Sequence, residues 1–140
     1  MLFSSVLTLF IKGEYSSIYW SLVMSFVDGF VIAVPSENKE QYIAHIEVAA
    51  EMFKEFGALK VVETWGCEVP DGEITSFPMA VKAKDSETVV FSWIEWPSKE
   101  VRDTAWQNIM NDPRMSPDNN PMPFDGKRII YGGFDVILEK

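Results

Sequence analysis

Two glutamates in predicted strands, Glu63 and Glu95, are the residues best suited to acid–base chemistry. By alternation we place both on one face, with Val61, Trp65, Phe91 and Trp93. If their strands pair, the two carboxylates approach each other and the pKa of one rises, as a general acid or base requires. Alternatively, each carboxylate lies in solvent at a strand end or pairs with a base such as Arg128.

The single histidine, His45, is the third candidate for catalysis. It flanks the apolar stripe of a predicted helix, where a general base reaches a pocket between helix and sheet. The alternative is a partly buried histidine at the edge of the core. With one histidine and one cysteine, Cys67, we expect neither a zinc nor a non-haem iron site. No cofactor fingerprint is present, so we expect no cofactor.

Aromatic side chains are common in the predicted strands, and they suit a flat hydrophobic ligand. Trp96, Trp106, Phe30, Phe91 and Phe134 are further members of this aromatic set. The alternative is that these rings form the core and a dimer interface, and that Asp28 makes a turn or bulge hydrogen bond. The predicted ligand pocket consists of Asp28, Trp65, Ser92, Trp93 and Tyr131.

The amino-acid composition limits the classes of function that the chain can have. The 140 residues carry a net charge of −9, and the 12 basic residues form no cluster. Nucleic acids and anionic membranes are therefore not expected as partners, because phosphates bind clustered Lys and Arg. A single cysteine excludes an internal disulfide and suits the cytoplasm.

The first residues differ from the rest of the chain. The apolar run that begins at Met1 is interrupted by Lys12, Gly13 and Glu14, so it is too short to span a membrane. We interpret residues 1–23 as an extension upstream of the true start at Met24, and residues 24–140 as one domain. The alternative is a genuine N-terminal helix or strand.

The periodicities predict six elements. Ser36 is a candidate N-cap for the first helix, Gly57 its C-terminal stop, and Ser98 the N-cap of the second helix. Gly132 and Gly133 in the last strand suggest a bulge or a close backbone approach. The expected elements are strand 26–34, helix 37–56, strand 58–66, strand 87–96, helix 99–111 and strand 128–138.

The order β-α-β-β-α-β predicts a ferredoxin-like α+β sandwich. Each helix has one apolar stripe, so both are expected on one face of an antiparallel sheet. The other face is too apolar to remain in water, which predicts a homodimer that pairs these faces.

Six short segments stand out between Met24 and the C-terminus: Phe26-Val-Asp-Gly-Phe30, Phe56-Gly-Ala-Leu59, Val69-Pro-Asp-Gly72, Val89-Val-Phe-Ser-Trp93, Asp112-Pro-Arg-Met115 and Met122-Pro-Phe-Asp-Gly-Lys-Arg128. In these segments the chain resembles a YbaA-like bacterial family of unknown function, from Met24 to the C-terminus. The resemblance implies a dimeric α/β barrel, and it carries over no catalytic residues.

Two functions remain open on this basis. The first is a dimer that binds a small hydrophobic or aromatic molecule or acts in stress response. The second is a cofactor-independent enzyme, monooxygenase-like or isomerase-like, with an acid/base carboxylate in an aromatic pocket. Both are supported by fold analogy alone.

Overall fold

The computed structural model describes residues 25–140, so the predicted extension 1–23 and the predicted start at Met24 lie outside the described residues. The strands are β1 (Phe26–Pro35), β2 (Lys60–Glu63), β3 (Glu87–Trp96) and β4 (Ile130–Asp135). The α-helices are α3 (Lys39–Glu55), α4 (Phe77–Ala80) and α5 (Lys99–Met110). Short 3-10 helices are η1 (Ser36–Asn38), η2 (Pro113–Met115) and η3 (Gly126–Arg128).

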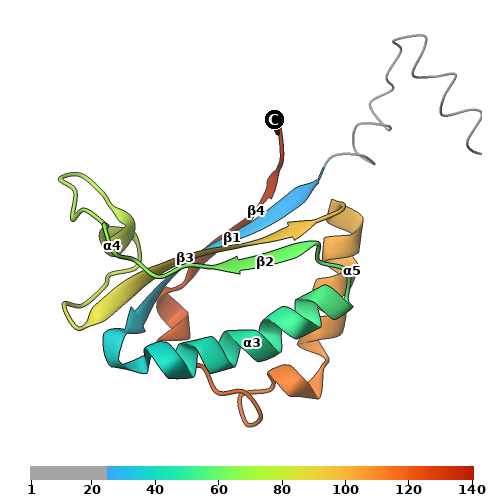
Figure 1. Cartoon of the computed structure of the whole chain (residues 1–140), viewed down its shortest axis with the longest axis horizontal. Helices are drawn as coiled ribbons and strands as arrows, with labels where there is room; N and C mark the ends of the chain where they lie inside the picture. The colour runs from blue at the N-terminus through green and yellow to red at the C-terminus, as the bar shows by residue number, and fades with distance from the viewer. Residues whose placement is uncertain (1–24) are drawn as a thin grey trace, which may run out of the picture.

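The strands form one antiparallel sheet in the order β2-β3-β1-β4, which confirms the predicted ferredoxin-like arrangement (Figure 1). The strand expected at 58–66 is shorter than predicted, although the amides of Thr64 and Gly66 still donate to β3 carbonyls. The strand expected at 128–138 is likewise confined to Ile130–Asp135.

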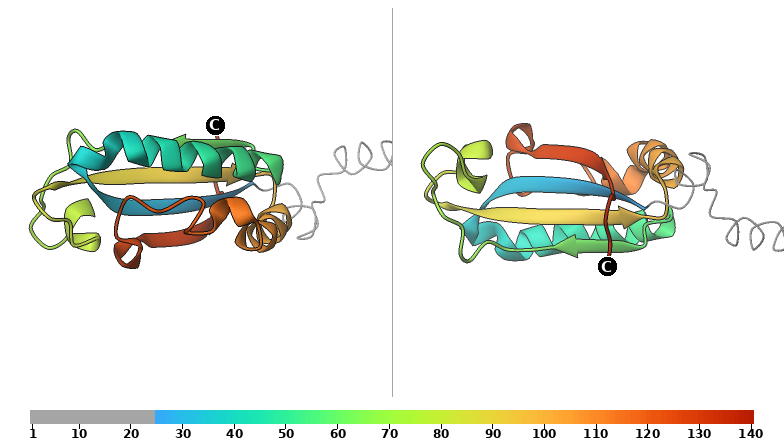
Figure 2. Two further views of the ribbon diagram at one scale, coloured as in Figure 1. Left: turned by 90° about the horizontal axis from the view of Figure 1, so that it is seen from below. Right: turned by 90° about the horizontal axis from the view of Figure 1, so that it is seen from above.

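Helices α3 and α5 lie on one face of the sheet, as their single apolar stripes predict (Figures 1 and 2). We call this the helix face. The core between helices and sheet includes Met52, Phe53 and Ile109 from the helices, and Ile94 and Trp96 from β3. The helix face therefore holds most of the buried apolar side chains, which is the main stabilising contribution expected for such a fold.

Two of the three helix ends predicted from local sequence are confirmed. The Ser98 side chain accepts a hydrogen bond from the Val101 amide, so it caps α5 as predicted. Gly57 follows α3 with a φ of 116°, a conformation that favours glycine. The cap predicted at Ser36 is wrong, because its hydroxyl lies 2.7 Å from the Thr88 hydroxyl and α3 begins only at Lys39.

The second face of the sheet, which we call the open face, is only partly covered. At one end Val81, from the segment after α4, packs on Val31, Ala33 and Val89. The rest exposes large side chains, including Phe91 (45% exposed), Ile130 (43%) and Phe134 (59%). The segment between the strands predicted at 58–66 and 87–96 thus contains the short helix α4, and the residues after it cover part of the open face.

The two adjacent glycines of β4 permit close approach and do not form a bulge, since the β1–β4 register is continuous. A Cβ at Gly133 would lie 2.6 Å from the Phe26 ring and 3.2 Å from Arg102 Nη2. On the open face, a Cβ at Gly132 would lie 3.3 Å from the Phe134 ring. A larger residue at Gly133 would therefore force Phe26 to move, whereas at Gly132 a small shift of the exposed Phe134 ring would make room.

Candidate functional site

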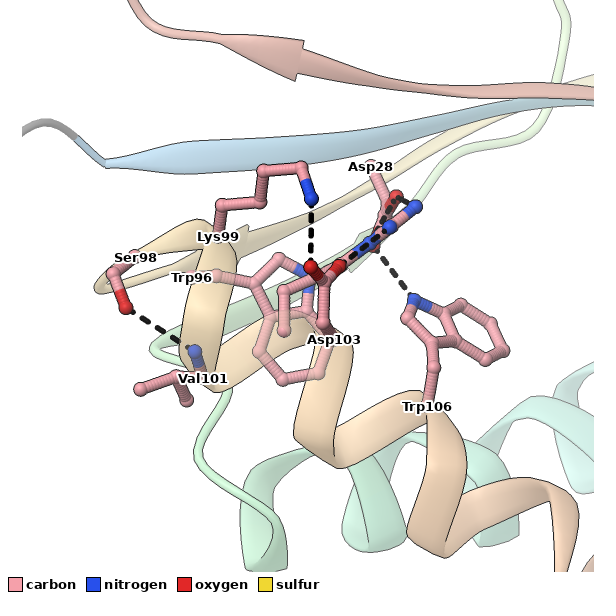
Figure 3. A network of polar contacts seen from close by, with 8 residues as sticks. Asp28, Trp96, Ser98, Lys99, Val101, Asp103 and Trp106 are labelled. Atoms are coloured by element: carbon pink, nitrogen blue, oxygen red, sulfur yellow. Dashed lines mark hydrogen bonds and ion pairs between the residues drawn. The ribbon is translucent and has the colours of Figure 1, made fainter. Parts of the chain in front are cut away.

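A buried carboxylate, Asp28, is the centre of the candidate site. It lies in β1 on the helix face with 2% of its surface exposed. The indole N–H groups of Trp96 and Trp106 each donate to Asp28 Oδ2 at 2.9 Å (Figure 3). Arg102 Nη2 donates to Oδ1 at 2.6 Å, and Arg102 Nε contacts both oxygens. Buried charges require such partners, and this carboxylate has three of them.

Helix α5 supplies Arg102 and Trp106, one turn apart, so both side chains reach the same strand residue. The hydrogen bond to Asp28 raises the pKa of the Arg102 guanidinium. Arg102 also donates from Nη1 to Asp103 at 3.0 Å, and its Cζ lies 5.3 Å from the centre of the Phe26 ring. Asp28, Asp103 and the Phe26 ring thus hold the guanidinium, which keeps its charge at any physiological pH.

A pocket of about 410 Å³ opens beside this pair, between α5, β1, β4 and the loop before β4. We call it the α5 pocket. Asp28 and Arg102 form its polar part. Its volume lies in the range of pockets that hold small molecules, and its walls are mostly apolar. The other lining residues are Phe30, Trp106, Met110, Gly126, Ile129 and Tyr131.

The structure brings together two of the five residues predicted to line a pocket. Asp28 and Tyr131 both line the α5 pocket, with Tyr131 mostly exposed. Trp65 lies beside the Tyr42 ring, at 6.3 Å between ring centres. The Trp93 ring is tilted against the Phe91 ring on the open face, at 5.6 Å between ring centres. The fifth residue, Ser92, is buried on the helix face at a different position.

Glu63 lies on the helix face, opposite Ser92. The Tyr42 hydroxyl donates to its carboxylate at 2.7 Å. Burial raises the pKa of Glu63, while the hydrogen bonds from Tyr42 and Ser92 oppose that shift. Burial, with the adjacent Glu63, also raises the pKa of Tyr42. This group forms a polar cluster between α3 and β2, and it does not line the α5 pocket.

The predicted approach of Glu63 and Glu95 is wrong. In the β2–β3 register Glu95 lies opposite Lys60, three residues from Ser92 along β3. Side chains an odd number of residues apart on a strand point to opposite faces, so Glu95 lies on the open face. The two carboxylates therefore cannot share a proton.

His45 is buried and connects α3 to the loop before β4. Its Nδ1 lies 3.0 Å from Asn120 Oδ1, and the Asn120 amide donates to the His45 carbonyl at 3.2 Å. Burial lowers the pKa of His45, and the bond to Asn120 partly offsets this. His45 therefore lies in a buried contact between α3 and this loop, and it does not line the α5 pocket.

The raised pKa of Glu63 predicts a pH-dependent stability. A carboxyl whose folded pKa exceeds its unfolded value stabilises the fold below its unfolded pKa, and that contribution is lost as pH rises through the folded pKa. Glu63→Gln imitates the protonated form and still accepts from Tyr42. As the pH rises from about 5 to about 8, we expect the free energy of unfolding of wild type to fall relative to that of Glu63→Gln.

Urea unfolding across that pH range measures this difference. Glu47→Gln, which changes an exposed acid on α3, is the matched control. A difference between Glu63→Gln and wild type that stays constant with pH would contradict the prediction.

Sequence reasoning missed Arg102, the residue that pairs with Asp28. One signal was available: a carboxylate in the middle of an apolar strand requires a cation when it is buried. Arg102 also precedes Trp106 by four residues, which places them on one helix face.

Comparisons with known proteins agree with this architecture. The chain is 59% identical over 117 residues to the uncharacterized protein YbaA of Escherichia coli (strain K12). The matched region covers 84% of this chain and 100% of that protein. YbaA of Shigella flexneri matches to the same extent. The resemblance to YbaA-like proteins is therefore confirmed.

Two solved structures share the fold. A dimeric ferredoxin-like protein from an uncultured marine organism superposes with a TM-score of 0.56 at 12% identity, over 84% of this chain and 99% of that chain. A second protein with the same description gives 0.54 at 14% identity, over 84% and 91%.

The family match covers most of the described structure. Residues 25–126 match the family described as "Protein of unknown function (DUF1428)", and this range includes α5 and every polar residue around Asp28. The chain belongs to this family.

Proposed function

We propose that this protein is a cytosolic homodimer that binds a small, mostly apolar or aromatic molecule in the α5 pocket. The observation that carries the proposal is the pocket itself, with its apolar walls beside the buried pair of Asp28 and Arg102. A buried polar pair at the side of an apolar pocket fixes the orientation of a ligand whose body contacts the walls.

The open face supports the homodimeric part of this proposal. Phe91, Ile130 and Phe134 expose apolar surface on one side of the sheet, and a second copy that pairs the same face would cover it. The two fold neighbours are described as dimeric. Placement in the cytosol rests on the single cysteine, Cys67. Within residues 25–140, none of the helices combines the length and the hydrophobicity of a membrane span.

The enzymatic alternative receives less support from the geometry. It requires an acid or base with a free lone pair in the pocket. Both oxygens of Asp28 already accept hydrogen bonds from Arg102 and two indoles, and Glu63 is bonded to Tyr42 outside the pocket. The arrangement therefore suits binding better than proton transfer.

A binding assay with a pocket variant tests the proposal. Native mass spectrometry of the protein purified from cells identifies a co-purifying molecule, and titration gives its affinity. Met110 lines the pocket and is 81% exposed, so Met110→Glu places a carboxylate at the opening with little effect on folding. We expect about a tenfold or greater loss of affinity for an apolar ligand, because the new charge must be desolvated.

Ile43→Glu is the matched control, because Ile43 is an exposed apolar residue on α3 that does not line the pocket. Equal affinity in Met110→Glu and wild type would contradict the proposal. If Met110→Glu and Ile43→Glu reduce the affinity for the ligand by the same factor, the ligand binds at another site.

A further inference from the structure

The Arg102 guanidinium is the only fixed cation on the wall of the α5 pocket, among the described residues. A guanidinium carries five N–H donors. Asp28 takes the Nε hydrogen and one on Nη2, and Asp103 takes one on Nη1. One hydrogen on each of Nη1 and Nη2 is left without an acceptor among residues 25–140. Arg102 can therefore donate to a ligand without breaking its bonds to the protein.

The charge around Arg102 is balanced. Asp28 and Asp103 are both bonded to Arg102, and Lys99 Nζ lies 2.6 Å from Asp103 Oδ2. The hydrogen bonds from Lys99 and Arg102 lower the pKa of Asp103, so it stays ionised at neutral pH. Two cations thus face two carboxylates, within a chain of net charge −9. An anionic ligand would gain no net attraction there and would lose its hydration.

From these two features we infer the chemical class of the ligand: an uncharged, mostly apolar molecule with a carbonyl-type acceptor that bonds to Arg102. The aromatic and aliphatic walls formed by Phe30, Trp106 and Ile129 contact its body. The inference rests on the proposed function, because it assumes that the α5 pocket binds a ligand. Beyond the proposed function, it states that the ligand carries a carbonyl-type acceptor and no net charge.

Three probes of matched size test the inference on the full-length wild-type protein. They are a naphthyl methyl ketone, the ethylnaphthalene of the same substitution and the corresponding naphthoate, titrated at neutral pH by ligand-observed NMR. The ketone offers a neutral acceptor, the hydrocarbon offers none, and the naphthoate offers a charged one. We expect the ketone to bind about tenfold more tightly than the hydrocarbon, because it bonds to a charged donor. We expect the naphthoate to bind more weakly than the ketone.

Asp103→Ala tests the charge argument separately. Asp103 is 41% exposed in its side chain, so its removal leaves the fold intact and gives the cluster a net positive charge. The affinity for naphthoate relative to ketone is expected to rise about fivefold or more. An unchanged ratio would overturn the argument from charge balance.

The outcomes separate the inference from the proposed function. Equal affinity for ketone and hydrocarbon, or tightest binding of naphthoate to wild type, would overturn the inference and leave the pocket as a binding site. No binding of any of the three would count against the proposed function itself.

Discussion

Replacing Asp28 with alanine is expected to lower the free energy of unfolding by about 3–5 kcal/mol, since it removes one partner of a buried ion pair. The variant leaves Arg102 with only Asp103, and it leaves the indole N–H groups of Trp96 and Trp106 without an acceptor. Asp28→Asn keeps one acceptor oxygen, so a smaller loss of about 1–3 kcal/mol is expected. Urea unfolding monitored by circular dichroism measures both variants.

Asp103→Ala is a stringent control, because Asp103 bonds to the same arginine from a partly exposed position. An exposed ion pair contributes about 0–1 kcal/mol, so the control is expected to lose little. If Asp28→Ala costs no more than Asp103→Ala, the Asp28 network does not hold α5 on the sheet.

Replacing Phe91 with glutamate is expected to weaken the proposed homodimer at least a hundredfold. Phe91 lies near the middle of the open face, packed between Phe77 and Trp93 with ring centres at 5.9 and 5.6 Å. Truncation of a central aromatic residue costs about 2–4 kcal/mol at a typical interface, and a buried carboxylate adds to this. Sedimentation velocity over a range of concentrations measures the dissociation constant.

Ile43→Glu again is the control, since α3 lies on the helix face, away from the predicted interface. Circular dichroism of the Phe91→Glu monomer shows whether it remains folded. Wild-type protein that sediments as a folded monomer at tens of micromolar would contradict the dimer directly.

Most of the fold follows from local signals. Ser98 and Gly57 act within a few residues of their own helix ends, so their roles are readable from sequence. Ser36 has the same local pattern, but a contact with Thr88, far along the chain, takes its hydroxyl. Tertiary contacts of this kind decide such cases, and no local pattern reveals them.

The candidate site was less predictable because it depends on register. Alternation places Glu63 and Glu95 within their own strands correctly, but it does not say which residues of β2 face which of β3. The register sets Glu63 against Ser92 and Lys60 against Glu95, and this separates the two acids. The role of Asp28 at the centre of the site depends on a residue outside its own strand, because Arg102 comes from a helix 74 residues later in the chain.

The shared carboxylate has a practical consequence for experiment. Two of the chain's five tryptophans, Trp96 and Trp106, bond directly to Asp28, and Trp106 also lines the α5 pocket. Indole emission responds to the polarity and charge around the ring. The molecule therefore carries its own optical reporter, and light from these two residues would register occupancy without any added dye.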